Sequence, residues 1–309
     1  MSPKLQTFLK RLLSTVILVA VLAGVVWWWH PMGFAALICV LCNISTIEWF
    51  RMLAGHEHLS NRWLILLAGL VFPWAMAWFA LNSPEDFSQA MGDPFDYMPE
   101  NQDALPCKLF AFRSLVAYSL VAFILELLRM DYRGQSAQDA LRSLGATLVA
   151  FIFPVWMFSF ALVALIQFPF SVFALLWLVI VTKLSDIYAY VCGVLLGRRL
   201  IKRPFSPAVS PKKTWEGIIG SFILTSLSAW FLLGSLWGVD MPAPTFFIIL
   251  MPCIFILSVT GDLAGSLIKR GLGVKDSGSL LPGIGGIFDL IDSPAFTISF
   301  FVVVASFYG

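Results

Sequence analysis

The chain has 309 residues, of which 59% are hydrophobic and only 12% are charged, and its formal net charge is +2. A soluble domain carries about 25% charged residues, so this composition excludes an ordinary soluble protein. The apolar segments run for about 20 residues without the alternation expected of membrane β-strands. We therefore predict an all-α fold, a polytopic integral membrane bundle of about nine transmembrane helices.

The predicted spans follow one another along the whole chain, at about residues 12–29, 34–53, 63–81, 109–128, 144–167, 170–196, 215–237, 245–265 and 286–307. The first span is long and ends in three tryptophans, which favours a membrane helix over a signal peptide. The span at 170–196 is overlong and contains Lys183 and Asp186, which indicates a kinked or protruding helix. We expect one membrane domain over residues 1–309, with less informative helices in 1–169 and chemically richer ones in 170–309.

The distribution of basic residues predicts the orientation. With the N-terminus inside, 17 of the 20 Lys and Arg fall on the cytoplasmic side, in the segments 1–11, 51–62, 129–142, 198–213 and 269–275. The opposite side receives an acidic, proline-containing loop at 82–108, interpreted as a solvated connector rather than a lid. This pattern satisfies the positive-inside rule. We read residues 129–143 as a short cytoplasmic loop.

The cysteines and histidines favour structural roles. Cys39 and Cys42 form a C-x-x-C inside an apolar span, and no His or further Cys stands at ligand spacing, so packing is favoured over a redox or metal pair. An odd total of five cysteines argues against a disulfide framework. The histidines fall at loop positions and are not expected to bind metal (His30, His56 and His58).

A first cluster of polar residues lies between Lys183 and Gly217. Its loop has six cations and no acid, and it ends in the motif S-P-K-K-T-W-E-G at 210–217. Such a loop alone indicates orientation or a lipid headgroup contact. Together with an Asp inside the preceding apolar span, it favours a phosphate or nucleotide site, whose candidate residues are Asp186, Tyr190, Ser210, Lys212, Lys213 and Thr214. Ser210 and Thr214 are candidate N-caps of a helix whose dipole would favour an anion.

A second cluster, Thr260 to Ser293, holds four Asp, three cations and many glycines between two apolar segments. An Asp at the centre of a membrane helix costs about 2.5–3.5 kcal/mol on insertion scales, which makes such residues functional candidates. If 261–270 ends a helix, one face carries Asp262, Ser266, Lys269 and Arg270. If a second helix opens near Gly286, Asp289 and Asp292 form an i, i+3 pair.

Between these two helices a glycine-rich segment carries Lys275, Asp276 and Ser277, and such a segment can bring backbone N–H groups close to phosphate oxygens. Carboxylates on facing helices can share a Mg²⁺ ion with a phosphate, and the neighbouring Lys and Arg suit a polyphosphate. The competing interpretation is a loop at the membrane edge with helix-capping Asp and snorkelling cations. Four acids grouped with three cations favour the functional interpretation.

In these two clusters the chain resembles the phosphatidate cytidylyltransferase, or CDP-diglyceride synthase, family. The C-terminal signature of that family is matched in register by Ser266, Lys269, Arg270, Lys275, Asp276, Pro282, Gly285, Gly286, Asp289 and Asp292. The upstream elements S-D-I-Y-A-Y at 185–190 and S-P-K-K-T-W-E-G also match. The resemblance is specific over residues 170–309. Two positions depart, with Ile284 at the family's His and Leu290 at its Arg; a lost charge-assisted contact to the triphosphate would cost about 1.5–3 kcal/mol.

The resemblance implies the reaction of CTP with phosphatidate to give CDP-diacylglycerol and pyrophosphate, for phospholipid biosynthesis. It implies catalytic roles for Asp262, Lys269, Arg270, Lys275, Asp276, Asp289 and Asp292, and substrate contacts for Asp186, Tyr190, Ser210, Lys212, Lys213, Thr214, Ser266 and Ser277. Asp262 and Asp289 are the expected main ligands of Mg²⁺, with Asp292 and Asp276 as further ligands or supporting groups and room for a second cation. No general base is required, because a phosphomonoester is already a nucleophile.

The expected partners are CTP, the phosphatidate lipid and the membrane. We expect no binding of nucleic acid, and the oligomer considered is a homodimer. The expected location is the bacterial inner membrane, with the active site facing the cytoplasm. Three alternatives stay open: an inactive paralogue, a CTP-dependent kinase of isoprenoid alcohols, and an ion or anion transporter. Buried Asp residues and broken helices suit a transporter, but transport gives no reason for the K-D-S-G and S-P-K-K-T stretches.

Overall fold

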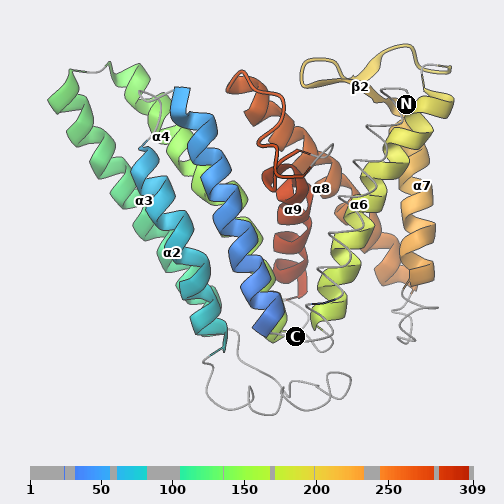
Figure 1. Ribbon diagram of the computed structural model, residues 1–309. Coiled ribbons are helices and arrows are strands. Elements are labelled where there is room, and N and C mark those ends of the chain that lie inside the picture. The colour runs from blue at the N-terminus through green and yellow to red at the C-terminus, as the bar shows by residue number, and fades with distance from the viewer. Residues whose placement is uncertain are drawn as a thin grey trace. The chain divides into compact units, whose positions relative to one another are not determined.

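The computed structural model describes residue 24 and residues 32–55, 61–81, 105–134, 136–167, 171–197, 199–232, 244–281 and 285–305 (Figure 1). Most of these residues are helical. The described residues form two compact units: one from within 1–172 together with 276–291, the other from within 173–275 together with 292–309. The segment 276–291 therefore belongs with the N-terminal helices, although it lies in the C-terminal half of the sequence.

The first unit is a bundle of apolar helices. It begins with the helix Met32–Gly55 (blue in Figure 1), whose last turn is the 3₁₀ turn η1 (Leu53–Gly55). The elements that follow are α2 (Arg62–Leu81), α3 (Leu105–Arg133), α4 (Ala137–Phe151), η2 (Ile152–Met157) and α5 (Phe158–Gln167). The last three run on without a break, and η2 is a π-helical turn around Pro154. Because proline has no N–H and clashes with the preceding turn, it favours such a local widening.

Aromatic side chains fill the centre of this unit, where α2, α3, α4 and η2 pack against one another. The ring of Tyr118 stacks on that of Phe151 with 4.0 Å between centroids, and Phe72 meets Phe151 edge-on at 5.4 Å. The Tyr118 hydroxyl donates a hydrogen bond to the carbonyl of Thr147 at 3.1 Å. The polar end of the tyrosine is thus satisfied inside an apolar core, as burial requires.

The second unit contains α6 (Ser171–Leu196, from residue 173), β1 (Pro204–Ser206), β2 (Ser210–Thr214), α7 (Trp215–Phe231), α8 (Pro244–Gly271) and the part of α9 (Phe288–Ala305) from residue 292. β1 and β2 form a small antiparallel hairpin, which was not predicted from the sequence. Hydrogen bonds between small polar side chains link its helices, as in Ser185–Ser258 at 2.7 Å and Thr182–Thr297 at 3.2 Å. Such contacts are typical of helix packing in membranes.

Glycines let α6 and α7 approach closely. A Cβ on Gly217 would lie 2.8 Å from the carbonyl oxygen of Ala189 and 3.2 Å from the Cα of Gly193. A Cβ on Gly220 would lie 2.9 Å from the sulfur of Cys192. The first turns of α7 therefore lie directly against the C-terminal half of α6, and this fixes where β2 meets α6.

Six helices within the described part of the chain are long and apolar enough to cross a membrane: Met32–Gly55, Arg62–Ala80, Cys107–Met130, Ala137–Leu165, Val172–Leu196 and Ile248–Gly271. Each coincides with a predicted span, which confirms an all-α integral membrane protein. α7 and α9 match the predicted spans at 215–237 and 286–307 over their described residues. The span at 12–29 falls outside the described residues apart from Gly24, so the count of nine stays a prediction.

Three local expectations can be compared with the structure. The predicted loop at 129–143 is wrong in extent, because α3 continues to Arg133 and α4 begins at Ala137 behind the Ser136 N-cap. The overlong span is one continuous helix of 26 residues, α6, and at 1.5 Å per residue it measures about 39 Å, longer than a hydrocarbon core of about 30 Å. Most of the acidic loop at 82–108 lies outside the described residues.

All five cysteines lie within the described residues and are free thiols, as predicted. Cys39 and Cys42 are completely buried, and the sulfur of Cys42 lies 3.8 Å from the hydroxyl of Ser159. The pair therefore packs between helices of the first unit. The three histidines lie outside the described residues.

Candidate active site

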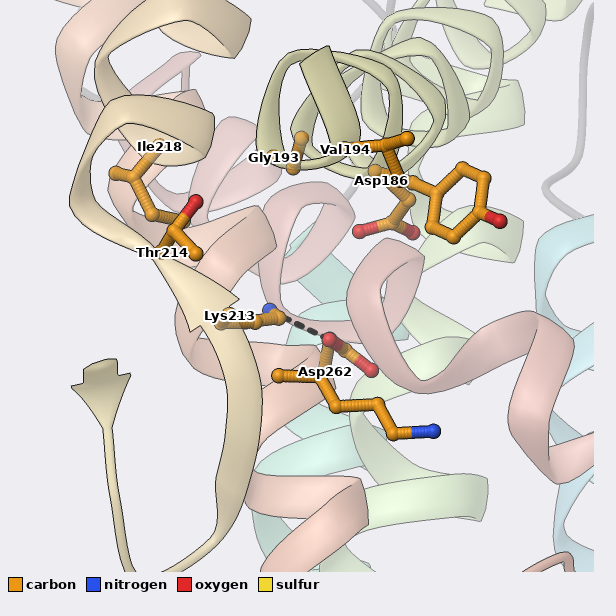
Figure 2. Close-up of a pocket in the computed structure, with 10 residues that line it drawn as sticks. Asp186, Gly193, Val194, Lys213, Thr214, Ile218 and Asp262 are labelled. Carbon is orange, nitrogen blue, oxygen red and sulfur yellow. Dashed lines mark ion pairs between the residues drawn. The ribbon is translucent and has the colours of Figure 1, made fainter. Parts of the chain in front are cut away.

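A pocket of about 420 Å³ in the second unit gathers residues from both polar clusters of the sequence (Figure 2). It is lined from α6 by Asp186, Ala189, Tyr190, Gly193 and Val194, from β2 by Lys212, Lys213 and Thr214, from α7 by Ile218 and from α8 by Asp262. Six of these were predicted as site residues. Their meeting in one pocket joins the S-P-K-K-T motif to the first Asp of the C-terminal signature.

The junction of β2 and α7 positions the two lysines. Thr214 is the N-cap of α7, with extended backbone angles, and its hydroxyl accepts a hydrogen bond from the backbone N–H of Gly217 at 3.1 Å. Thr214 is buried, so the cap is held firmly against α6. Lys212 and Lys213 directly precede this cap, beside the positive end of the helix dipole.

Lys213 and Asp262 form the shortest ion pair of the pocket. The ammonium nitrogen of Lys213 lies 2.6 Å from a carboxylate oxygen of Asp262, and the two side chains are 18% and 30% exposed (Figure 2). Asp186 faces the same pocket from α6, with its side chain 33% exposed. The pocket therefore presents two carboxylates and two lysines to whatever enters it.

A second ion-pair network lies beside the pocket and is centred on Lys183. Its ammonium nitrogen is 3.6 Å from Asp186 and 3.8 Å from Asp292. Asp292 is 3% exposed, and it also interacts electrostatically with Lys269, which is itself buried. A Cβ on Gly265 would lie 2.8 Å from a carboxylate oxygen of Asp292, so this glycine lets α8 approach the acid closely.

The two networks are electrostatically connected. Asp186, Asp262 and Asp292 are close enough for each carboxylate to influence the others. Lys183 pairs with Asp186 and Asp292, Lys213 pairs with Asp262, and Lys269 interacts electrostatically with Asp292. Charges away from water are stable when they are paired. This set of acids and amines can bind a polyanion together with a hard cation.

The donor set of the pocket fits Mg²⁺, which is usually held by one or two carboxylates while phosphate oxygens and waters complete its coordination. Asp186 and Asp262 supply two carboxylates to one space. Within the described ranges, no group of three or more His, Cys, Asp or Glu side chains could hold a metal ion. Waters or the phosphates of a bound nucleotide would complete the coordination around these two carboxylates.

Asp289, the other expected metal ligand, belongs to the first unit and organises its own segment there. One of its carboxylate oxygens, Oδ2, accepts hydrogen bonds from the backbone N–H of Ser277 at 3.0 Å, the Ser277 hydroxyl at 2.9 Å and the N–H of Gly286 at 2.8 Å. Gly285 has φ +124°, a left-handed conformation that L side chains rarely adopt. Asp289 thus holds the ends of the turn between Ser277 and Gly286.

Glu48 completes this arrangement, and it is not among the site residues predicted from the sequence. It lies in the helix Met32–Gly55, is 4% exposed, and accepts hydrogen bonds from Ser277, Ile287 and Phe288. The signal that would have found it is an ionisable residue inside an apolar span, the same signal that singled out Asp186.

The other predicted residues lie outside the pocket. Ser266, half-buried, follows Asp262 by one turn of α8, and Arg270 is exposed at the end of that helix. Lys275 and Asp276 are exposed in the following loop, and Ser210 pairs with Ser206 in the hairpin. Of the two departures from the family pattern, Leu290 is half-buried in the first turn of α9, and Ile284 lies outside the described residues.

Comparison with known proteins adds independent information on the family. The sequence model of the Cytidylyltransferase family matches residues 9–308. The chain is similar to a protein from Helicobacter pylori (strain ATCC 700392 / 26695) named phosphatidate cytidylyltransferase, with 41% identity over 129 residues, 41% of this chain and 45% of the relative. Proteins of the same name from Haemophilus influenzae and Synechocystis sp. are 41% identical over 135 and 127 residues, or 42% and 39% of this chain.

These alignments span 45% of the Haemophilus protein and 40% of the Synechocystis protein, so the chain aligns with less than half the length of these relatives. The family match, in contrast, runs through almost the whole chain and includes every residue of the pocket. The chain therefore belongs to the Cytidylyltransferase family.

Proposed function

We propose that this protein is a membrane phosphatidate cytidylyltransferase, which makes CDP-diacylglycerol and pyrophosphate from CTP and phosphatidate. The observation that carries the proposal is the meeting of Lys212 and Lys213 with Asp186 and Asp262 in one pocket between membrane helices. The names of the relatives support the substrate pair.

In the proposed reaction, a phosphate oxygen of phosphatidate attacks the α-phosphorus of CTP. A new P–O bond forms there, and the bond from the α-phosphorus to the oxygen bridging it to the β-phosphate breaks, so pyrophosphate leaves with that electron pair. The attacking phosphomonoester is already an anion, so no side chain has to remove a proton from it. The main demand on the protein is to hold two anions in line and to neutralise their charge.

The lysines of this chain can meet that demand. Lys212 and Lys213 stand at the helix N-terminus, where an anion is favoured. Lys213 already contacts a carboxylate, Asp262, at 2.6 Å, so its ammonium group is held in the pocket before a phosphate arrives. Lys183 and Lys269 neutralise the negative charges of Asp186 and Asp292.

We propose Mg²⁺ as the cofactor, held by Asp262 and Asp186 together with substrate phosphates. When bound, it supplies charge neutralisation for the triphosphate and the leaving pyrophosphate. Asp292 is largely enclosed and paired with Lys183. We therefore propose that it orients the Lys183 side chain, and through it Asp186, and that it does not contact the metal ion. Asp289 as a ligand and a second cation remain predictions from the resemblance.

The apolar part of the pocket supports a lipid substrate. Ala189, Val194 and Ile218 line it beside the lysines, and the side chain of Val194 is 67% exposed. The neighbouring surface of α6 and α7 is also aliphatic, with exposed side chains at Ile187, Val191, Ile219 and Ile223. A phosphate headgroup can therefore reach the lysines while its acyl chains stay along an apolar surface.

We further propose that the protein lies in the bacterial inner membrane with this pocket at the cytoplasmic face. The proposal rests on the distribution of Lys and Arg along the sequence and on the bacterial sources of the relatives. A homodimer, and the absence of nucleic acid among the partners, remain predictions.

The test is the product formed by purified protein in detergent micelles with Mg²⁺ and radiolabelled CTP. With phosphatidate we expect labelled CDP-diacylglycerol and one pyrophosphate for each turnover. An isoprenoid alcohol offered in its place should give no phosphorylated lipid. Formation of a lipid phosphate and CDP from the alcohol, without any CDP-lipid from phosphatidate, would overturn the proposal in favour of a kinase.

A further inference from the structure

Glu48 is a buried carboxylate in a membrane-spanning helix, and it is 4% exposed. A charge in such a place must be paired or hydrogen-bonded to be stable. Its acceptors are used by three donors of a single distant segment: Ile287 N–H to Oε1 at 2.8 Å, and Phe288 N–H and the Ser277 hydroxyl to Oε2, both at 2.9 Å. Glu48 therefore fastens the loop before α9 and the first residue of α9 to the N-terminal helix.

The same segment contains Asp289, and Ser277 joins the two carboxylates. The Ser277 hydroxyl oxygen lies 2.9 Å from Glu48 Oε2 and 2.9 Å from Asp289 Oδ2. A hydroxyl carries one hydrogen, so this donor serves one of the two carboxylates at a time. The side chain of Ser277 therefore links Glu48 directly to Asp289.

The backbone of the segment closes tightly around Glu48. A Cβ on Gly278 would lie 2.7 Å from Glu48 Oε1, and a Cβ on Gly286 would collide with both carboxylate oxygens and with the Ser277 hydroxyl. The ring of Phe288, the residue bonded to Oε2, is fully buried and packs edge-on against Trp49 at 5.3 Å. The described residues at both ends of the loop, Ser277–Gly278 and Gly286–Phe288, are therefore held tightly against Glu48.

We propose that Glu48 is a positioning residue for the reaction: it fixes the start of α9 and, through Ser277, the orientation of the Asp289 carboxylate. Its catalytic consequence rests on the proposed function and, in addition, on the prediction from the family resemblance that Asp289 is a ligand of Mg²⁺. The competing interpretation is that Glu48 contributes to folding alone.

Glu48→Gln is the informative substitution, because it keeps the shape and removes one acceptor oxygen. Both oxygens of Glu48 accept from a backbone N–H, so the amide nitrogen of Gln faces a donor whichever way it is turned. The matched control is Glu126→Gln. Glu126 is another buried glutamate of the first unit, 3% exposed, and it accepts from the Ser143 hydroxyl at 2.6 Å and pairs with Arg129.

The first measurement is backbone hydrogen exchange in the full-length protein in detergent, which does not depend on activity. We expect exchange of the Ile287 and Phe288 amides to accelerate by at least about tenfold in Glu48→Gln, because an opening free energy lower by about 1.4 kcal/mol corresponds to a tenfold change. The control should leave these amides unchanged.

The second measurement is CDP-diacylglycerol formation as a function of Mg²⁺ concentration. In Glu48→Gln we expect kcat to fall about tenfold and the Mg²⁺ concentration for half-maximal rate to rise several-fold, with a smaller change in KM for CTP. If a substitution only reduces the amount of folded protein, the outcome allowed for Glu126→Gln, the maximal rate falls but the Mg²⁺ concentration for half-maximal rate stays the same. That difference separates positioning from stability.

Ser277→Ala serves as the second variant, since it removes the shared hydroxyl and leaves the N–H contacts of Glu48 in place. In Ser277→Ala we also expect the Mg²⁺ concentration for half-maximal rate to rise. The proposal can therefore still be tested if Glu48→Gln folds poorly. Unchanged Mg²⁺ dependence in Ser277→Ala, or equal behaviour of Glu48→Gln and Glu126→Gln, overturns the proposal. If the wild type forms no CDP-diacylglycerol, the proposed function fails, and the exchange rates decide separately whether Glu48 holds the loop.

Discussion

Each acid that faces the pocket or lies beside it has a lysine within 4 Å, and this pairing explains how three carboxylates persist between membrane helices. Asp262 is paired with Lys213, and Lys183 serves both Asp186 and Asp292. Removing one partner of a buried pair is more damaging than never having had the pair, because the remaining charge is left unbalanced. The exposed fractions of Asp262 and Lys213 place them within reach of a ligand, whereas Asp292 is enclosed.

At this scale we predict that Asp262→Asn lowers kcat/KM by more than about tenfold, at least about 1.4 kcal/mol of transition-state stabilisation. The substitution removes a charge and a metal donor with little change in shape, so the protein should still fold. Steady-state kinetics with CTP and phosphatidate is the measurement. Asp139→Asn is the matched control, because Asp139 is exposed at the start of α4 and pairs with Arg142. A rate for Asp262→Asn within tenfold of wild type would remove Asp262 from the ligand set.

A second residue-scale prediction concerns the departures from the family pattern. The acids and lysines around Ile284 and Leu290 are all retained in the sequence. We therefore expect an active enzyme in which Ile284→His and Leu290→Arg change KM for CTP by less than about tenfold, under 1.4 kcal/mol. Titration of CTP against initial rate in each variant is the measurement. Activity in the double variant but none in the wild type would identify this chain as a pseudoenzyme.

Among the secondary-structure elements, the junction between β2 and α7 positions Lys212 and Lys213 in the pocket. The hairpin is short, and its position depends on the Thr214 cap and on the close contact between Gly217 and α6. A Cβ on Gly197 would also meet the Thr214 side chain, at 2.9 Å. The Thr214 cap, the contact of Gly217 with α6 and the positions of Lys212 and Lys213 therefore depend on one another.

We predict that Thr214→Val loses about 1 kcal/mol of stability through the missing cap and also raises KM for CTP. The side chain keeps its branched shape but no longer accepts from the Gly217 N–H, so the lysines lose their fixed position. Thr214→Ser, which retains the hydroxyl, should remain close to wild type in both thermal stability and kinetics. Equal KM values for the Val and Ser variants would show that the cap does not position the lysines.

For the protein as a whole, the orientation in the membrane decides which compartment the pocket faces. Most of the basic residues fall in segments that one orientation places on a single side, and the acidic loop at 82–108 falls on the other. We predict that a cysteine introduced at Asp96 is labelled from the outside and one at Lys202 only from the cytoplasm. Impermeant thiol reagents on intact and opened cells provide the measurement. Labelling of the Asp96 site only from the cytoplasm would reverse the topology.

The helical membrane architecture and the two polar clusters could be predicted from the amino-acid sequence alone. A bilayer offers no partner for backbone N–H and C=O groups, so long apolar segments must become helices whatever their neighbours are. The helix ends were also readable: α8 carries Asp262, Ser266, Lys269 and Arg270 in its last turns, as the spacing predicted. The cost of a charge among apolar residues, likewise a local property, singled out Asp186.

Which charged groups contact one another became visible only in the folded structure. Nothing local in the sequence indicates that Lys213 contacts Asp262, or that Glu48 binds Ser277, 229 residues away. The spacing put Asp289 and Asp292 on one face of a helix, yet Asp289 accepts hydrogen bonds from its own loop and Asp292 pairs with Lys183. Their different roles follow from where α9 begins. Asp289 lies in the first turn, beside N–H groups that have no partner within the helix, whereas Asp292 lies one turn later, where it accepts from the Ser293 N–H at 2.7 Å and pairs with Lys183 of α6.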